Sequence, residues 1–236
     1  MEQTGHHAGV TTARQSAWQD DGFLLFADAV SPEDCQVAIA ALESTSREGP
    51  GDRRLLEQSW CRGIAETLRS DGRFREALPA GHVATLCTFF SKSTSTNWLV
   101  PLHQDLSIAV AERIDDASLG GWSEKDGVLH VQPPFAFLET LVAVRVHLDD
   151  CGADDGPLHV VPGSHRSGRL APADATRLRN AQGTQACVAR RGDVLIMRPL
   201  LLHASSKATG SNRRRVLHYV FGPHELPHGL RWHMAL

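Results

Sequence analysis

The chain has 236 residues, 42% of them hydrophobic, and a formal net charge of −3 at pH 7. This length suits one domain with a sizeable core, and the small charge provides no general attraction for nucleic acid or anionic lipid. The sequence has neither an apolar run long enough to span a bilayer nor the apolar core of a signal peptide, and its five cysteines form no C-x-x-C pair. We therefore expect a cytoplasmic protein without nucleic-acid or membrane partners; its oligomeric state is left open.

The N-terminal third carries helix signals. We expect residues 1–16 to be a disordered tail that includes the pair His6-His7, and a strand to begin near Gly22. The segment Ser31-Pro32-Glu33-Asp34 combines a capping serine, a proline at the first helical position and acids in the first turn, which predicts a helix start. A second helix is predicted over residues 59–78, with an interruption near Asp71-Gly72.

From His82 onward, short apolar or β-branched runs alternate with Gly, Pro, Asp and Asn. Closely spaced strands with few helices between them predict a sandwich or jelly roll rather than βαβ units. The polar segment 112–127 is interpreted as an excursion between strands. The fold class is therefore mainly β, with N-terminal helices packed on one sheet and a single domain over residues 17–236. The strands are expected at 82–91, 98–110, 128–132, 138–149, 158–162, 186–190, 193–198, 200–206 and 213–221.

One short motif carries the chemistry. His103-Gln104-Asp105 follows an apolar run, and in a strand residues i and i+2 point to the same face. An imidazole and a carboxylate can therefore aim at one point, and the best third ligand is His203, at the end of a later apolar run. Two histidines and a carboxylate, with other positions open, are the ligand set of non-haem Fe(II) oxygenases.

A basic strand follows the last of these histidines. Period-2 alternation places Arg214 on one face of residues 213–221, and Arg213 and Arg215 on the other. An arginine that points into a sandwich is costly unless it meets an anion, and a dicarboxylate co-substrate would supply one. The alternative interpretation is that all three arginines are solvated on an edge strand.

These pieces together resemble the phytanoyl-CoA dioxygenase family of Fe(II)/2-oxoglutarate oxygenases. The resemblance spans residues about 21 to 220, in the order of the family. Its most specific parts are the H-Q-D motif and the turn that ends in Pro-Gly-Ser-His. The segments that carry it are Asp21-Gly22-Phe23, Leu102-His103-Gln104-Asp105-Leu106, Leu148-Asp149-Asp150-Cys151, residues 156–165, Gly192-Asp193-Val194 and Leu202-His203-Ala204-Ser205.

The resemblance implies a double-stranded β-helix, which is a jelly roll, with iron held by His103, Asp105 and His203. It implies that Arg214, eleven residues after the last histidine, anchors 2-oxoglutarate together with Ser205, and that Arg213 or Arg215 takes this role if the register slips by one. Two further residues, Thr88 and Arg145, correspond to positions that contact the co-substrate in other members. Arg145 departs from the tryptophan of one branch and could favour an acidic substrate.

The function implied is hydroxylation of an unactivated C–H bond, with Fe(II), 2-oxoglutarate and O2 as cofactor and co-substrates and with release of succinate and CO2. The expected partner is a small molecule: a carboxylic acid, an amino acid, an acyl thioester or a natural-product intermediate. Asp105 disfavours halogenation, because related halogenases have a small residue there. The alternatives are a cupin-like metal enzyme that does not use 2-oxoglutarate and a non-catalytic jelly-roll binding protein.

Overall fold

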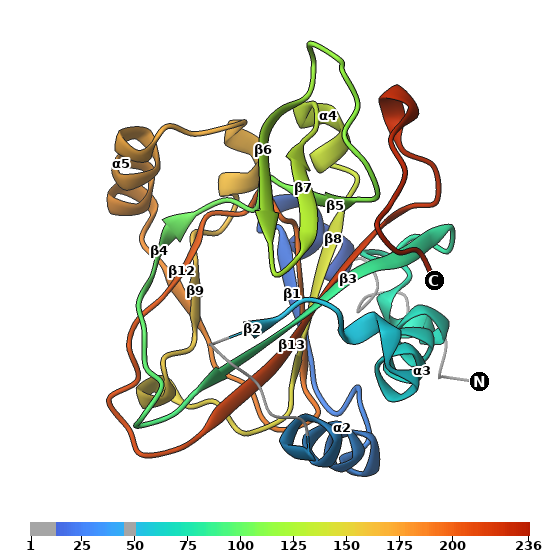
Figure 1. Ribbon diagram of the computed structural model, residues 1–236. Coiled ribbons are helices and arrows are strands. Elements are labelled where there is room, and N and C mark those ends of the chain that lie inside the picture. Colours follow the sequence, from blue (N-terminus) through green and yellow to red (C-terminus); the bar gives the residue numbers. More distant parts are fainter. Residues whose placement is uncertain (1–12, 45–50) are drawn as a thin grey trace, which may run out of the picture.

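The computed structural model describes residues 13–44 and 51–236, and these residues form a jelly roll with two main antiparallel sheets (Figure 1). The larger sheet has six strands in the order β1, β11, β8, β13, β3 and β2. Its strands are β1 (Phe23–Phe26), β2 (Gly51–Asp52), β3 (His82–Lys92), β8 (Val142–His147), β11 (Val194–Met197) and β13 (Arg214–Pro223). The mainly β architecture predicted from the sequence is confirmed.

The second sheet has four strands in the order β10, β9, β12 and β4, and a small third sheet extends one end of the molecule. The second sheet contains β4 (Val100–His103), β9 (Leu158–Val160), β10 (Gln185–Cys187) and β12 (His203–Ser205); the third contains β5 (Ile108–Val110), β6 (Gly120–Lys125) and β7 (Val128–Gln132). The helices are α2 (Pro32–Ser44), α3 (Ser59–Ser70), α4 (Phe135–Leu138) and α5 (Pro172–Gln182). Short 3-10 turns lie at Leu55–Glu57, Gly72–Phe74, Ala153–Asp155, Ser164–Ser167 and Pro227–Gly229.

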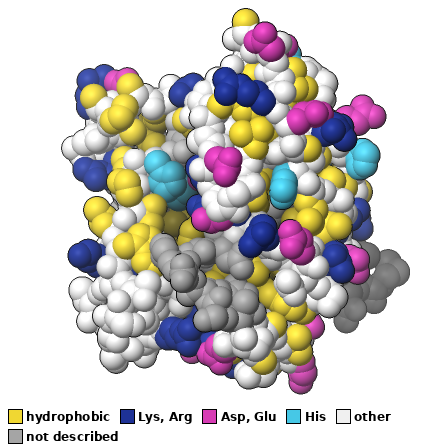
Figure 2. Space-filling view, viewed as in Figure 1, with side chains coloured by type: hydrophobic (Ala, Val, Ile, Leu, Met, Phe, Trp, Pro, Cys, Tyr) yellow, Lys and Arg dark blue, Asp and Glu magenta, His cyan; other side chains and the backbone are white. Residues whose placement is uncertain are grey.

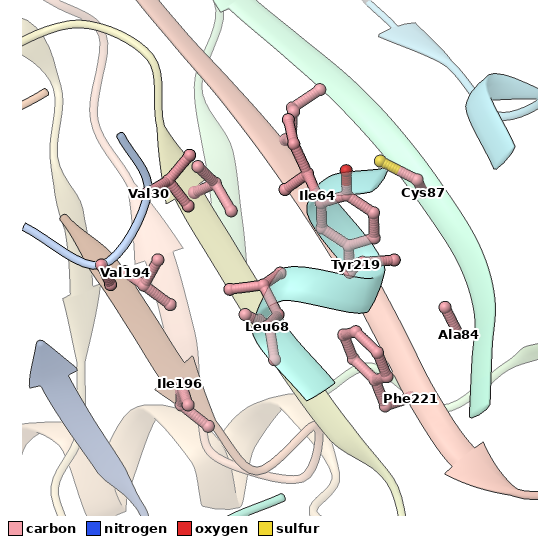
Figure 3. Packing of buried hydrophobic residues seen from close by; sticks show 14 of the residues in the cluster. Val30, Ile64, Leu68, Ala84, Cys87, Val194, Ile196, Tyr219 and Phe221 are labelled. Atoms are coloured by element: carbon pink, nitrogen blue, oxygen red, sulfur yellow. The ribbon is translucent and has the colours of Figure 1, made fainter. Parts of the chain in front are cut away.

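Helices α2 and α3 cover the outer face of the larger sheet. Figure 3 shows Ile64 and Leu68 of α3 beside Tyr219 and Phe221 of β13. Tyr219 and Phe221 are fully buried, and the Tyr219 hydroxyl donates to the Cys61 carbonyl oxygen at 3.1 Å. Because alternate residues of a strand point to opposite faces, this packing turns the even-numbered residues of β13 toward the interior of the jelly roll. The hydrophobic core thus fixes the face that carries Arg214.

The N-terminal helix start agrees with its sequence signal. The backbone N–H of Asp34 donates to Ser31 Oγ at 3.0 Å, as a capping serine does. The second predicted helix is present as α3 over Ser59–Ser70 and ends at the interruption predicted near Asp71-Gly72. A 3-10 turn, Gly72–Phe74, follows, so the α-helix does not resume toward residue 78. The Asp71 side chain accepts the N–H of Arg73 there, which starts the new turn.

Three other segments differ from the sequence predictions. Residues 112–127, interpreted as an excursion, contain strand β6. Residues 98–110 form two strands, with the H-Q-D motif at their junction, and residues 13–20 are helical. The first twelve residues, with His6-His7, lie outside the described part of the chain. Among the helices of the described residues, none is long and apolar enough to cross a membrane.

Candidate metal centre and its cavity

The second sheet brings the two predicted histidine ligands together. His103 is the last residue of β4, and His203 is the first residue of β12. The two strands are antiparallel neighbours, and His203 pairs directly with His103 (Figure 1). Asp105 lies two residues beyond the end of β4, where its backbone N–H donates to the Pro199 carbonyl oxygen at 2.9 Å. The three residues therefore meet although one hundred positions separate the histidines.

The three side chains form a group with one open side. The distance from Asp105 Oδ1 to His103 Nε2 is 3.6 Å, and that from Asp105 Oδ2 to His203 Nε2 is 3.7 Å. One ligand atom from each residue lies within 4.8 Å of the others. In both histidines Nδ1 lies 2.8 Å from a carbonyl oxygen, of Pro101 and Leu201 respectively. A carbonyl can only accept, so Nδ1 carries the proton and each Nε2 keeps its lone pair for a metal.

The charges of the group suit a divalent cation. Burial alone would raise the pKa of the Asp105 carboxyl, but His203, His103 and His218 outweigh it and hold this pKa well below its usual range. Burial lowers the pKa of His203 to about 4, so its imidazole is neutral near pH 7. An ionised carboxylate beside a neutral imidazole with a free Nε2 is the donor set that Fe(II) takes. The predicted triad therefore fits an Fe(II) ion.

A cavity of about 560 Å³ extends from the triad to Arg214 on β13. Arg214 is 3% exposed, and its Nη1 donates to the Gly156 carbonyl oxygen at 2.7 Å. Ser205 Oγ donates to the same oxygen at 2.9 Å. The Nε of Arg214 is buried without a hydrogen-bond partner among the described residues. A buried guanidinium with an unused donor fits an anionic ligand, because leaving such a group unpaired is costly.

The neighbouring arginines point away from the cavity. Arg213 Nη1 is 3.0 Å from Glu43 Oε1. Arg215 makes two contacts with Asp149, Nη2–Oδ1 at 2.7 Å and Nε–Oδ2 at 2.8 Å. The structure thus separates the three arginines in the way that strand alternation predicts, and Arg214 alone among them lines the cavity.

The chain matches the family model of phytanoyl-CoA dioxygenase over residues 18–216. It belongs to the phytanoyl-CoA dioxygenase family. Among curated proteins none matches significantly. Solved structures similar to this family member include AviO1 from Streptomyces viridochromogenes Tue57, with 19% identity, coverage of 92% of this chain and 96% of that chain, and a TM-score of 0.63.

Two further structures of similar fold have informative descriptions. HygX from Streptomyces hygroscopicus, determined with nickel and 2-oxoglutarate bound, has 18% identity, coverage of 94% and 87%, and a TM-score of 0.60. SnoK, a non-haem α-ketoglutarate-dependent carbocyclase of nogalamycin biosynthesis, has 14% identity, coverage of 89% and 83%, and a TM-score of 0.64. At these identities the likeness shows a shared fold.

The two other predicted co-substrate residues lie on the larger sheet. Arg145 of β8 lines the main cavity, where its Nη1 lies 3.1 Å from His218 Nδ1 and its guanidinium carbon 5.7 Å from the centre of the Phe90 ring. Thr88 of β3 is buried and lines an adjoining lobe of about 130 Å³. The two spaces share lining residues, among them Phe90 and Asp105, and Arg145 lines the same cavity as Arg214.

Two residues of the site were absent from the sequence prediction. His218 has no role in the sequence prediction, yet its Nε2 lies 3.9 Å from Asp105 Oδ2. Lys92, at the end of β3, is fully buried beside Ser205. Both lie on the inward faces of their strands, since Lys92 pairs with Arg214 and Thr88 with His218. Strand alternation alone indicates that Lys92 shares a face with Thr88, and His218 with Arg214. The pairing of β3 with β13 was needed to show that this face is the inward one.

Proposed function

We propose that this member of the phytanoyl-CoA dioxygenase family is an Fe(II)/2-oxoglutarate-dependent oxygenase that hydroxylates a C–H bond of a small molecule. The observation that carries the proposal is one cavity with a His-Asp-His group at one place and the buried pair Arg214 and Ser205 at another. When bound, Fe(II) with 2-oxoglutarate and O2 supplies the oxidation, in which C–H becomes C–OH and succinate and CO2 leave.

The protein's own residues hold and orient these components. His103 and His203 would hold the ion through Nε2 and Asp105 through a carboxylate oxygen, the ligand set of oxygenases that keep positions for a co-substrate. Arg214 and Ser205 offer donors to the distal carboxylate of the co-substrate, because both already point at a shared acceptor. A cupin-like enzyme without 2-oxoglutarate would not need this buried anion site, which disfavours that alternative.

The substrate carries an anionic group in this proposal. Figure 2 shows acidic and basic side chains interspersed on the outer face of the molecule. The cavity differs, because its ionised lining residues are Arg53, Lys125, Arg145 and Arg214, with Asp105 as the acid. Iron would bind Asp105, and the distal carboxylate of the co-substrate would pair with Arg214. Arg53 pairs with Asp126, whereas Lys125 donates to Ser107 Oγ at 3.3 Å, so Lys125 and Arg145 remain for a carboxylate or phosphate of the substrate.

The first experiment adds Fe(II) and 2-oxoglutarate without oxygen and records the weak visible charge-transfer band of the chelate. We expect a band with the wild-type protein. Iron binding without a band would favour the enzyme that uses no 2-oxoglutarate, and no iron binding would favour a non-catalytic binding protein.

The second experiment measures succinate release with pairs of carboxylic acids and their amides. We expect the acids to stimulate turnover and the matched amides to do so less. Asp105→Ala should abolish coupled succinate release, because it removes a ligand and, among the described lining residues, the one acid that would offset the charge of the ion. Full turnover in this variant would contradict the triad assignment.

A further inference from the structure

Lys92 is a buried cation that the proposed function leaves without a role. Its side chain has no solvent exposure, and Nζ donates to Ser205 Oγ at 2.7 Å and to the Ser206 carbonyl oxygen at 2.6 Å. The ammonium also lies 5.4 Å from the centre of the Trp98 ring. Lys92 is paired with Arg214 across β3 and β13, so two cationic side chains lie side by side, and of the two, Arg214 lines one end of the cavity.

This arrangement is costly for an empty protein. Lys92 forms no ion pair with a carboxylate among the described residues, and its neighbours Arg214 and Arg145 are also cations. Burial, followed by the charges of these two arginines, lowers the pKa of Lys92 to about 8. Buried charges ordinarily need a partner of opposite sign. An anion that binds at this end of the cavity would supply it.

The hydrogen bonds of Ser205 show how Lys92 acts on that anion. An ammonium can only donate, so Ser205 Oγ accepts from Lys92 and its own proton points elsewhere. That proton goes to the Gly156 carbonyl oxygen, which also accepts from Arg214 Nη1. One neutral acceptor therefore takes two donors, and a carboxylate, which accepts more strongly, can replace it.

We propose that Lys92 is a positioning residue for the distal carboxylate of 2-oxoglutarate: its ammonium orients the Ser205 hydroxyl so that both Ser205 and Arg214 donate to that carboxylate. The inference rests on the proposed function, since it concerns the co-substrate of the same site. Lys92 then affects the binding of the distal carboxylate of 2-oxoglutarate, and it does not affect the binding of the 2-oxo acid group that faces the metal.

The test compares two ligands that differ at that end. 2-Oxoglutarate and 2-oxobutanoate share the 2-oxo acid group, but 2-oxobutanoate lacks the distal carboxylate. Calorimetry with the full-length, nickel-loaded protein gives both Kd values without turnover. In Lys92→Met we expect the Kd for 2-oxoglutarate to rise about tenfold or more, the loss of one hydrogen bond to a charged group. The Kd for 2-oxobutanoate should stay within about twofold, since it makes no contact there.

Two controls separate this role from general damage. Lys207→Met removes the exposed lysine two residues after Ser205 and should leave the ratio of the two Kd values unchanged. The double variant Lys92→Met/Ser205→Ala should bind 2-oxoglutarate no more weakly than Ser205→Ala alone, because Lys92 acts through Ser205. If Lys92→Met does not fold, Lys92→Leu is a second variant without a donor and should change the ratio in the same direction.

An unchanged ratio in the folded Lys92 variant would overturn the positioning role, whether both ligands weaken equally or neither does. Additive losses in the double variant would overturn action through Ser205. A wild-type protein that binds 2-oxobutanoate as tightly as 2-oxoglutarate would show that no distal carboxylate is held, and both proposals would then fail. If the wild-type protein prefers 2-oxoglutarate and the Lys92 variant has the same ratio of Kd values, the proposed function stands and only the role of Lys92 is overturned.

Discussion

Arg213 and Arg214 are adjacent in sequence, yet one is paired with Glu43 on the outside and the other is buried in the cavity. We predict that Arg214→Ala raises the KM for 2-oxoglutarate about 10- to 150-fold, since a hydrogen bond to a charged group contributes about 1.5–3 kcal/mol. Steady-state succinate release at varied 2-oxoglutarate measures this change. Arg213→Ala should leave that KM unchanged, and an equal rise in both variants would show that the charge acts at long range rather than by contact.

Alternation along one strand separated Arg214 from Arg213 and Arg215 without knowledge of the partner strands, and the family resemblance selected Arg214 as the anchor. Lys92 required more. A lysine at the end of a strand ordinarily keeps its ammonium in water. Only the pairing of β3 with β13 places it beside Arg214. Residues whose environment comes from a non-local strand pair are therefore the ones that sequence reasoning misses at this site.

At the level of elements, the turn before β9 supports the anion site through Gly156. This residue has φ +65°, and an added Cβ would lie 2.7 Å from the Ser206 carbonyl oxygen. We predict that Gly156→Ala lowers the free energy of unfolding by about 2–4 kcal/mol, from left-handed backbone strain and overpacking together. It should also weaken 2-oxoglutarate binding, because the Gly156 carbonyl oxygen accepts from Ser205 and Arg214. Urea unfolding and calorimetry measure the two effects.

Gly127, in the turn between β6 and β7, provides the control for this substitution. It also has a positive φ, +74°, but no atom lies within 4 Å of an added Cβ. Gly127→Ala should therefore cost only the backbone strain, about 1–2 kcal/mol, and leave the 2-oxoglutarate Kd unchanged. Equal losses of stability in the two variants would show that the contact with Ser206 relaxes without cost.

Secondary-structure elements differ in how well the hydrophobic pattern of the sequence predicts them. Strand β7 occupies the predicted residues 128–132, and its Val128 and Val131 side chains are fully buried. Strand β6, Gly120–Lys125, has few apolar residues and buries none of its residues fully, so no hydrophobic pattern marks it. Helix α5 buries only Ala175 and was not predicted, although Pro172 and Asp174 stand in its first turn. Elements that contribute little to the core are thus the ones whose sequence carries the weakest signal.

For the whole molecule, buried histidines outside the metal centre make stability depend on pH. Burial, with the nearby cation Arg198, lowers the pKa of His165 to about 4, and burial with Arg145 and Arg214 lowers the pKa of His147 to about 3. Below their ordinary pKa of 6.5 the unfolded chain binds protons that the folded chain does not. The contribution of these histidines to the free energy of unfolding is therefore fully present above pH 6.5, and it is lost as the pH drops from 6.5 toward 4.

We expect each histidine to contribute on the order of 1–3 kcal/mol to this loss. Urea unfolding of the metal-free protein between pH 7.5 and 4.5 measures it, and the metal-free state keeps iron release out of the comparison. His165→Gln should lower the starting stability, because the ring fills the space over Gly22, where an added Cβ would lie 2.3 Å from Nδ1. It should nevertheless flatten the fall, since one proton-binding difference is gone. A fall as steep as that of the wild type would place the acid sensitivity in other groups and leave His165 with a purely steric role against the turn at Gly22.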